Sequence, residues 1–378
     1  MLKRLWQIFG PIICALVLVV VVIYAYPQGR KYSYEAEKRS AVTLTNENFK
    51  SRKNKTTALS DQNHRFVPYF GSSEWLRFDA LHPAVLAEKY DRNYRPYFIG
   101  QRGSASLNQY LGMQQMLPEL QNGTAVYVLS PQWFTKKGYN SAAFQQFFNN
   151  DQLSSFLSQN QTDANSQYAA KRILEMKPEI TMKSQLSKVA KGQDLNTVDK
   201  TYIQFMAELN RREDSLFSPL AASNNANYDK KVLPYLKELP DQFSYDALDQ
   251  LAVRDAEAHT KSNDFGIDDR FYAYLRRLVN LKVSRKIFPM KFLKNMVIYS
   301  WFLINLPSQI QMSYLSFHLL IASGWLILDL IRTCMMLRFL KSVINWKVKD
   351  LPILQISQKM AINLTLCKTL FIWAGKVG

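Results

Sequence analysis

Apolar and polar positions change their spacing several times along this 378-residue chain, and these changes mark its elements. Residues 8–26 form an apolar run without a charge, and residues 27–63 form a polar stretch with few large apolar side chains. From residue 64 onward, short β-rich runs alternate with segments whose apolar residues recur at helical spacing. Alternation of this kind is typical of βαβ units, so the pattern predicts an α/β domain over residues 64–277, with a parallel sheet flanked by helices.

Three predicted strands each end in a cluster of small or polar residues. The strands and their clusters are 66–70 with Gly71-Ser72-Ser73-Glu74, 95–99 with Gly100-Gln101-Arg102-Gly103-Ser104, and 124–129 with Ser130-Pro131-Gln132. Helical segments are expected at 75–90, at 105–120 and over most of 140–250. Because ligands of α/β proteins bind at the carboxyl ends of the strands, we expect the three clusters to lie together there.

The N-terminal apolar run predicts a membrane anchor. Lys3 and Arg4 precede the charge-free residues 8–26, which as a helix would nearly span a hydrocarbon core of about 30 Å. We interpret 1–7 as a cytoplasmic head, 8–26 as a transmembrane helix and 27–63 as a stalk that holds an extracellular domain near the cell membrane. A cleaved signal peptide is the alternative, but no clean small-x-small site follows the run.

Composition narrows the function. The net charge of +18 suggests a nucleic-acid partner, but residues 281–378 contain thirteen Lys or Arg and only two acids, so much of the excess lies in the tail. We therefore expect no nucleic-acid partner. The three cysteines, Cys14, Cys334 and Cys367, leave residues 15–333 without any. This spacing excludes a disulfide framework or a cysteine metal site, and we expect no metal and no cofactor.

The stretch around Ser72 and Ser73 has two interpretations. A serine held where a strand turns into a helix, beside converging backbone N–H groups, can act as a nucleophile next to an oxyanion site. The same serines can also simply cap the helix that follows.

The three clusters, the N-terminal anchor, Leu81-His82-Pro83 and Asp269-Arg270-Phe271-Tyr272 together resemble the DltD family, which belongs to the SGNH (GDSL-like) hydrolase superfamily. The resemblance covers residues 1–277. It implies an SGNH-like parallel sheet and a role in placing D-alanine esters on lipoteichoic acid in a Gram-positive envelope. The partners that it implies are lipoteichoic acid, a membrane O-acyltransferase and a D-alanyl carrier protein.

The resemblance also assigns roles to individual residues. Ser73 corresponds to the nucleophile, and its N–H to one oxyanion donor. The N–H of Gly103 corresponds to the second donor, and the side-chain amide of Gln132 stands near the third, although it is longer than the family's asparagine. Arg102 could bind an anionic substrate or be an ordinary surface arginine. The Gln132 amide could instead form hydrogen bonds within a loop at the strand end.

The superfamily's Asp-x-x-His, which supplies the base, is absent from this chain. After Arg277 the only histidine is His318, inside the apolar run 312–331. The abrupt loss of acids suggests that residues 278–378 are read out of frame. Shifted by two bases, synonymous codons for residues 365–378 can encode Asp-Thr-Ile-His within a family-like block. We therefore predict one frameshift near residues 276–286 and a chain without catalytic activity.

Three functions remain open from the sequence. The first is acyl transfer through Ser73. The second is a non-catalytic docking protein, anchored in the membrane, for a D-alanyl carrier or lipoteichoic acid. The third takes residues 312–331 as a second membrane segment of a multi-span protein.

Overall fold

The computed structural model describes residues 2–29, 31–121, 123–129, 139–223, 226–263, 268–270, 272–273 and 311–317. The chain divides into two compact units. All described strands belong to the first unit, which comprises Met1–Val253 and Ser284–His318.

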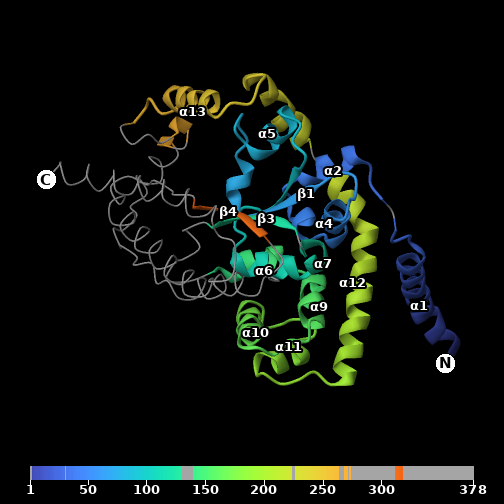
Figure 1. Cartoon of the computed structure of the whole chain (residues 1–378). Coiled ribbons are helices and arrows are strands. Elements are labelled where there is room, and N and C mark those ends of the chain that lie inside the picture. Colours follow the sequence, from blue (N-terminus) through green and yellow to red (C-terminus); the bar gives the residue numbers. More distant parts are fainter. Residues whose placement is uncertain are drawn as a thin grey trace. The chain divides into compact units, whose positions relative to one another are not determined.

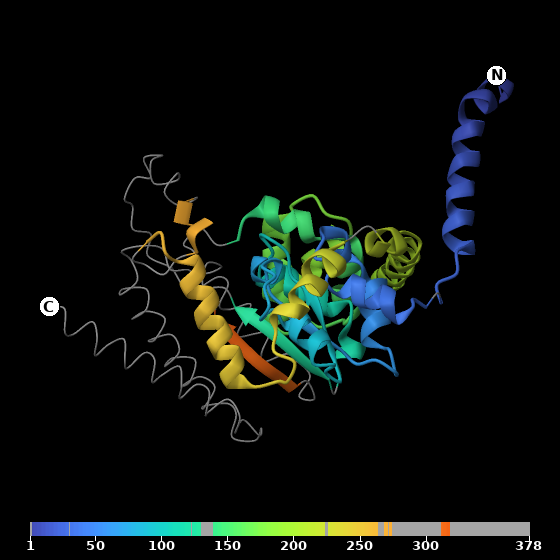
Figure 2. The same cartoon turned by 90° about the horizontal axis from the view of Figure 1, so that it is seen from above.

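The sheet has four parallel strands in the order β2-β1-β3-β4 (Figure 1). Their bounds are β1 Phe66–Phe70, β2 Arg95–Ile99, β3 Thr124–Leu129 and β4 Gln311–Phe317. The first three strands confirm the predicted strands and the predicted parallel α/β class. The fourth lies within the segment that we predict to be out of frame, and it runs beside β3 in both views (Figures 1 and 2).

Helices supply most of the remaining described chain. They are α1 (Leu2–Ala25), α2 (Tyr34–Ala41), α3 (Asn46–Lys50), α4 (Arg52–Leu59), α5 (Pro83–Lys89), α6 (Ser106–Gln114), α7 (Leu117–Leu120), α8 (Ser141–Phe147), α9 (Asn150–Ser158), α10 (Ala164–Met176), α11 (Lys183–Ala190), α12 (Thr197–Ser223) and α13 (Tyr245–His259), with the shorter helices η1 (Ser73–Leu76), η3 (Tyr228–Val232) and η4 (Leu233–Glu238).

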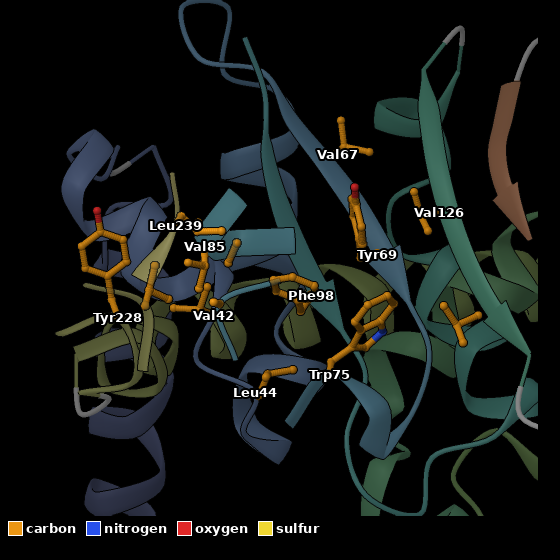
Figure 3. Packing of buried hydrophobic residues seen from close by; sticks show 14 of the residues in the cluster. Val42, Leu44, Val67, Tyr69, Trp75, Val85, Phe98, Val126, Tyr228 and Leu239 are labelled. Atoms are coloured by element: carbon orange, nitrogen blue, oxygen red, sulfur yellow. The ribbon is translucent and has the colours of Figure 1, made fainter. Parts of the chain in front are cut away.

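Strand β1 is buried along its whole length, so the sheet is covered on both faces at this strand. Successive side chains of a strand point to opposite faces. Tyr69 of β1 and Phe98 of β2 contribute to one face, where they contact the indole of Trp75 at centroid distances of 5.5 and 5.1 Å (Figure 3). Residues of α5, η3 and η4 join this core. On the other face, the hydroxyl of Tyr97 lies 3.1 Å from the Ser40 hydroxyl.

Residues 27–63, predicted as a stalk, contain α2, α3 and α4. Helix α2 contacts β2, and α4 contacts β1. Polar side chains of this stretch are buried because they bond to one another and to backbone: Asn48 Nδ2 donates to the Ser40 carbonyl oxygen at 2.9 Å, and Lys55 Nζ donates to the Phe49 carbonyl oxygen at 2.8 Å. These helices therefore cover the sheet.

Two predicted helices are interrupted. The segment 75–90 splits into η1 and α5 because Pro83 begins α5 after an N-cap at His82. The segment 105–120 splits into α6 and α7, with Pro118 in the first turn of α7. Within the described residues, no helix reaches the length and apolarity that a membrane span requires, so the predicted transmembrane anchor is not confirmed.

Candidate active site

Two of the three predicted clusters meet at the carboxyl edge of the sheet. Phe70 pairs with Ile99 in the register of β1 and β2, so the loop after β1 and the loop after β2 leave the sheet side by side. The third cluster, with Gln132, falls in residues 130–138, which lie outside the described residues. The expected meeting of the clusters is therefore confirmed for those that contain Ser73 and Gly103.

The two serines after β1 do not cap η1. Ser72 occupies the N-cap position, yet its side chain accepts no hydrogen bond from the helix. Its hydroxyl instead donates to the Gln101 carbonyl oxygen at 3.2 Å, and the Ser72 N–H donates to the carboxylate of Glu74. The Ser73 side chain is half-buried and has no hydrogen-bond partner among the described residues. The capping interpretation is wrong, and the Ser73 hydroxyl is available for other chemistry.

Two backbone N–H groups at this edge also have no acceptor in the described part of the chain. Neither Ser73 N–H nor Gly103 N–H donates a hydrogen bond within the described part of the chain. The neighbouring N–H groups are taken, since Ser72 donates to Glu74 and Arg102 donates to the Gln101 side chain at 2.8 Å. The two N–H groups that the family resemblance assigns to oxyanion binding thus have no acceptor among the described residues.

Glycine is required at the two strand ends because the indole of Trp75 packs against both. A Cβ on Gly71 would lie 2.3 Å from Trp75 Nε1, and a Cβ on Gly100 would lie 2.6 Å from Trp75 Cδ1. Trp75 itself is 8% exposed. The indole therefore packs against both glycines and leaves no room for a side chain at either position.

Gly103 requires glycine for a different reason. Its φ of +91° lies in the left-handed region that side chains disfavour. The Tyr139 hydroxyl can donate its single proton either to the Gly103 carbonyl oxygen, 2.8 Å away, or to Asn108 Oδ1. Burial raises the pKa of Tyr139, so this hydroxyl keeps its proton and stays a donor beside the loop. Arg102, next to Gly103, is exposed and pairs with no acid among the described residues.

Neither His82 nor His64 can serve Ser73 as a base. The ring of His82 is engaged on both sides: Nδ1 accepts from Ala84 N–H at 3.3 Å, which leaves the proton on Nε2, 3.3 Å from the Trp75 carbonyl oxygen. Burial lowers the pKa of His82 to about 4. His64 pairs with Asp61 at 2.9 Å just before β1, at the opposite end of that strand. These positions confirm a structural role for His82, and His318 lies outside the described residues.

Sequence reasoning missed two side chains that bind the loops. Ser104 and Gln109 both contact the Gly71 carbonyl oxygen from α6 and the turn before it. Ser104 belonged to a recognised cluster but carried no assigned role. Gln109 lay in a segment that read as an ordinary helix.

Known proteins resemble this chain over most of its length. The family model for DltD protein matches residues 41–300. The chain is 33% identical to Protein DltD of Lacticaseibacillus rhamnosus over 290 residues, which cover 75% of the chain and 67% of that relative. It is 28% identical to Protein DltD of Staphylococcus aureus, over 59% of the chain and 56% of that relative. It is 27% identical to Protein DltD of Bacillus subtilis, over 74% of the chain and 71% of that relative.

The family model covers well over half of the chain, and its match includes both loops that carry Ser73 and Gly103. Membership supports a role in the D-alanylation of lipoteichoic acid. On this evidence, the chain belongs to the DltD family.

Proposed function

We propose that the site of this family transfers D-alanyl groups to lipoteichoic acid through an ester on Ser73. The observation that carries the proposal is the conjunction of a half-buried serine hydroxyl without a described partner and two free backbone N–H groups, on Ser73 and Gly103, at the carboxyl edge of the sheet. This is the donor set that an acyl-transfer site needs.

In the proposed reaction, the Ser73 oxygen attacks the carbonyl carbon of an activated D-alanine. Its proton passes to a general base, the bond to the carrier breaks, and the carrier leaves with that proton. The N–H groups of Ser73 and Gly103 bind the carbonyl oxygen as it becomes negative, with Gln132 as the third donor. A hydroxyl of lipoteichoic acid then attacks the seryl ester. Its proton passes through the base to the Ser73 oxygen, which leaves as the free hydroxyl. Arg102, which is exposed beside this edge, attracts the polyanionic acceptor.

We infer that this particular chain is catalytically inactive because it lacks the Asp-x-x-His. The ring of His82 is bonded on both sides, and His64 pairs with Asp61 before the start of β1, at the end opposite Ser73. The proposed frameshift would explain the loss. Removal of the base from a serine site costs several orders of magnitude in rate.

We propose that the chain is attached to the cell membrane through residues 8–26, with its α/β domain outside the cell. The support is the charge-free sequence of this run and the exposure of its large apolar side chains, such as Leu16, Leu18 and Val21. The proposed partners are lipoteichoic acid, a membrane O-acyltransferase and a D-alanyl carrier protein.

The test compares this chain with a version whose reading frame is restored after residue 277. Both are treated with a fluorophosphonate, which labels activated serines, and each is matched by its Ser73→Ala variant. We expect labelling of Ser73 in the restored protein and at least a hundredfold slower labelling in the present chain. An unlabelled but folded restored protein would favour the docking function instead. Equal labelling of the two would overturn the inferred inactivity.

A further inference from the structure

Two buried side chains bind one backbone atom behind the proposed nucleophile. Gln109, which is fully buried in α6, donates through Nε2 to the Gly71 carbonyl oxygen. The hydroxyl of Ser104, also buried, lies 3.1 Å from the same oxygen. Gly71 is two residues before Ser73, so this carbonyl belongs to the turn that presents the serine.

A count of protons and lone pairs shows how the contacts fit together. The single proton of Ser104 could go to the Gly71 carbonyl oxygen or to that of Gln101, 2.9 Å away. The Gln101 oxygen already accepts from Ser72 Oγ at 3.2 Å and from Ser104 N–H at 2.9 Å, which uses both of its lone pairs. The Ser104 proton therefore goes to Gly71.

The remaining bonds close the network. The second proton of the Gln109 amide points to the Ser104 oxygen at 3.3 Å, and the Gln101 N–H reaches the same oxygen at 3.3 Å. Both loops are thus joined through buried groups whose bonding capacity is used. The one exception in this network is Gln109 Oε1, which is buried without a partner.

We propose that Gln109 is a positioning residue of this site: its amide fixes the Gly71 carbonyl oxygen and so aligns Ser73 with the free N–H groups of Ser73 and Gly103. The inference rests on the proposed function. A glutamine with an unsatisfied acceptor costs stability compared with an apolar residue of the same volume. Its donor contacts to the turn are a reason for its presence.

The test introduces a thiol in place of the serine, because a thiol reports on neighbouring N–H donors without a base. In the full chain carrying Ser73→Cys, the pH profile of iodoacetamide alkylation is measured by peptide mass spectrometry, which separates position 73 from Cys14, Cys334 and Cys367. Aligned N–H groups stabilise the thiolate, so we expect the pKa of this thiol to lie below its ordinary value of about 8.5.

Addition of Gln109→Met should raise the pKa of this thiol by about one unit and slow alkylation at pH 7 about tenfold. Ser104→Ala should act in the same direction and serves if Gln109→Met fails to fold. Gln152→Met is the matched control, because Gln152 is equally buried but lies in the α9 capping box. It should leave the profile unchanged at a similar loss of stability.

The outcomes separate the two claims. A lowered pKa that neither Gln109→Met nor Ser104→Ala changes, in folded protein, overturns the positioning role and leaves the proposed function intact. An ordinary pKa already in the Ser73→Cys chain contradicts the proposed function itself. Equal effects of Gln109→Met and Gln152→Met would show that only general stability was altered, and would also overturn the positioning role.

Discussion

Substitution of Gly100 tests the close packing beneath the two loops. In Gly100→Ala, the new Cβ would lie 2.6 Å from Trp75 Cδ1, 2.9 Å from the Gly71 carbonyl carbon and 3.0 Å from the Gly71 carbonyl oxygen. Two of these atoms are backbone of the neighbouring strand end, so a change of rotamer cannot relieve the overlap. We therefore place the cost of overpacking near the upper end of its usual range, at about 3 kcal/mol.

Alanine also restricts the unfolded chain, which offsets about 0.4–1 kcal/mol of this cost. The net expectation is a loss of about 2 kcal/mol in the free energy of unfolding. Gly112→Ala is the control, because Gly112 is a buried position within α6 where a Cβ would meet no atom within 4 Å. There, alanine should stabilise the protein by about 0.5–1 kcal/mol, as in any helix interior.

Urea unfolding of the full chain in a mild detergent, followed by far-UV circular dichroism, measures both changes. The two variants should differ by about 3 kcal/mol. A Gly100→Ala protein within 0.5 kcal/mol of the parent would refute the steric argument, and so would equal effects at the two glycines. A changed slope of the transition would instead indicate a change in the unfolded state.

Further predictions concern pH and the second loop. Because the pKa of His82 is lowered to about 4, the unfolded chain binds one more proton than the folded protein between pH 6.5 and 4. The free energy of unfolding should therefore fall by up to about 3 kcal/mol as pH drops through this window. His82→Asn, which keeps an N-cap, should remove this pH dependence in urea titrations. Burial, followed by the nearby Asp61, raises the pKa of Glu37 to about 7. The stability that protonated Glu37 contributes is therefore present below pH 4.5 and is lost as pH rises to 7. At pH 8 Glu37→Gln should be more stable than the parent, and an equal or lower urea midpoint would contradict this. Gly103→Ala, at a φ of +91°, should lose about 1–2 kcal/mol in the same assay although its Cβ would meet nothing closer than 3.8 Å.

The strand–loop pattern of the N-terminal half was readable from the sequence because each of its strands is a short β-rich run that ends at a small residue, Gly71, Gly100 or Ser130. The expectation that Ser73 and Gly103 share one edge needed only the rule for parallel strands, and β1 and β2 follow it. Pro83 by itself signals a break, but the helical spacing of apolar residues through 75–90 predicted one continuous helix.

Other features depend on partners far away in the chain and could not be read locally. The Ser72 hydroxyl bonds to the carbonyl oxygen of Gln101, 29 residues later, and does not cap the helix next to it. The polar composition of residues 27–63 predicted a stalk, but it could not show that Asn48 and Lys55 are buried, because their hydrogen-bond partners Tyr97 and Gln115 lie far away in the chain. The reading-frame hypothesis stays a prediction, because it concerns the DNA.

The parallel pairing of β3 with β4 has a consequence for synthesis. Leu129 and Phe317 are partners in this ladder, and 188 residues separate them. At about 5–20 residues per second, a ribosome needs roughly 10–40 s to supply the second strand after the first. During this interval β3 is an apolar edge with unpaired backbone groups, which favours aggregation of the nascent chain. The topology therefore leaves this edge of β3 unpaired for the whole interval, independent of how stable the finished fold is.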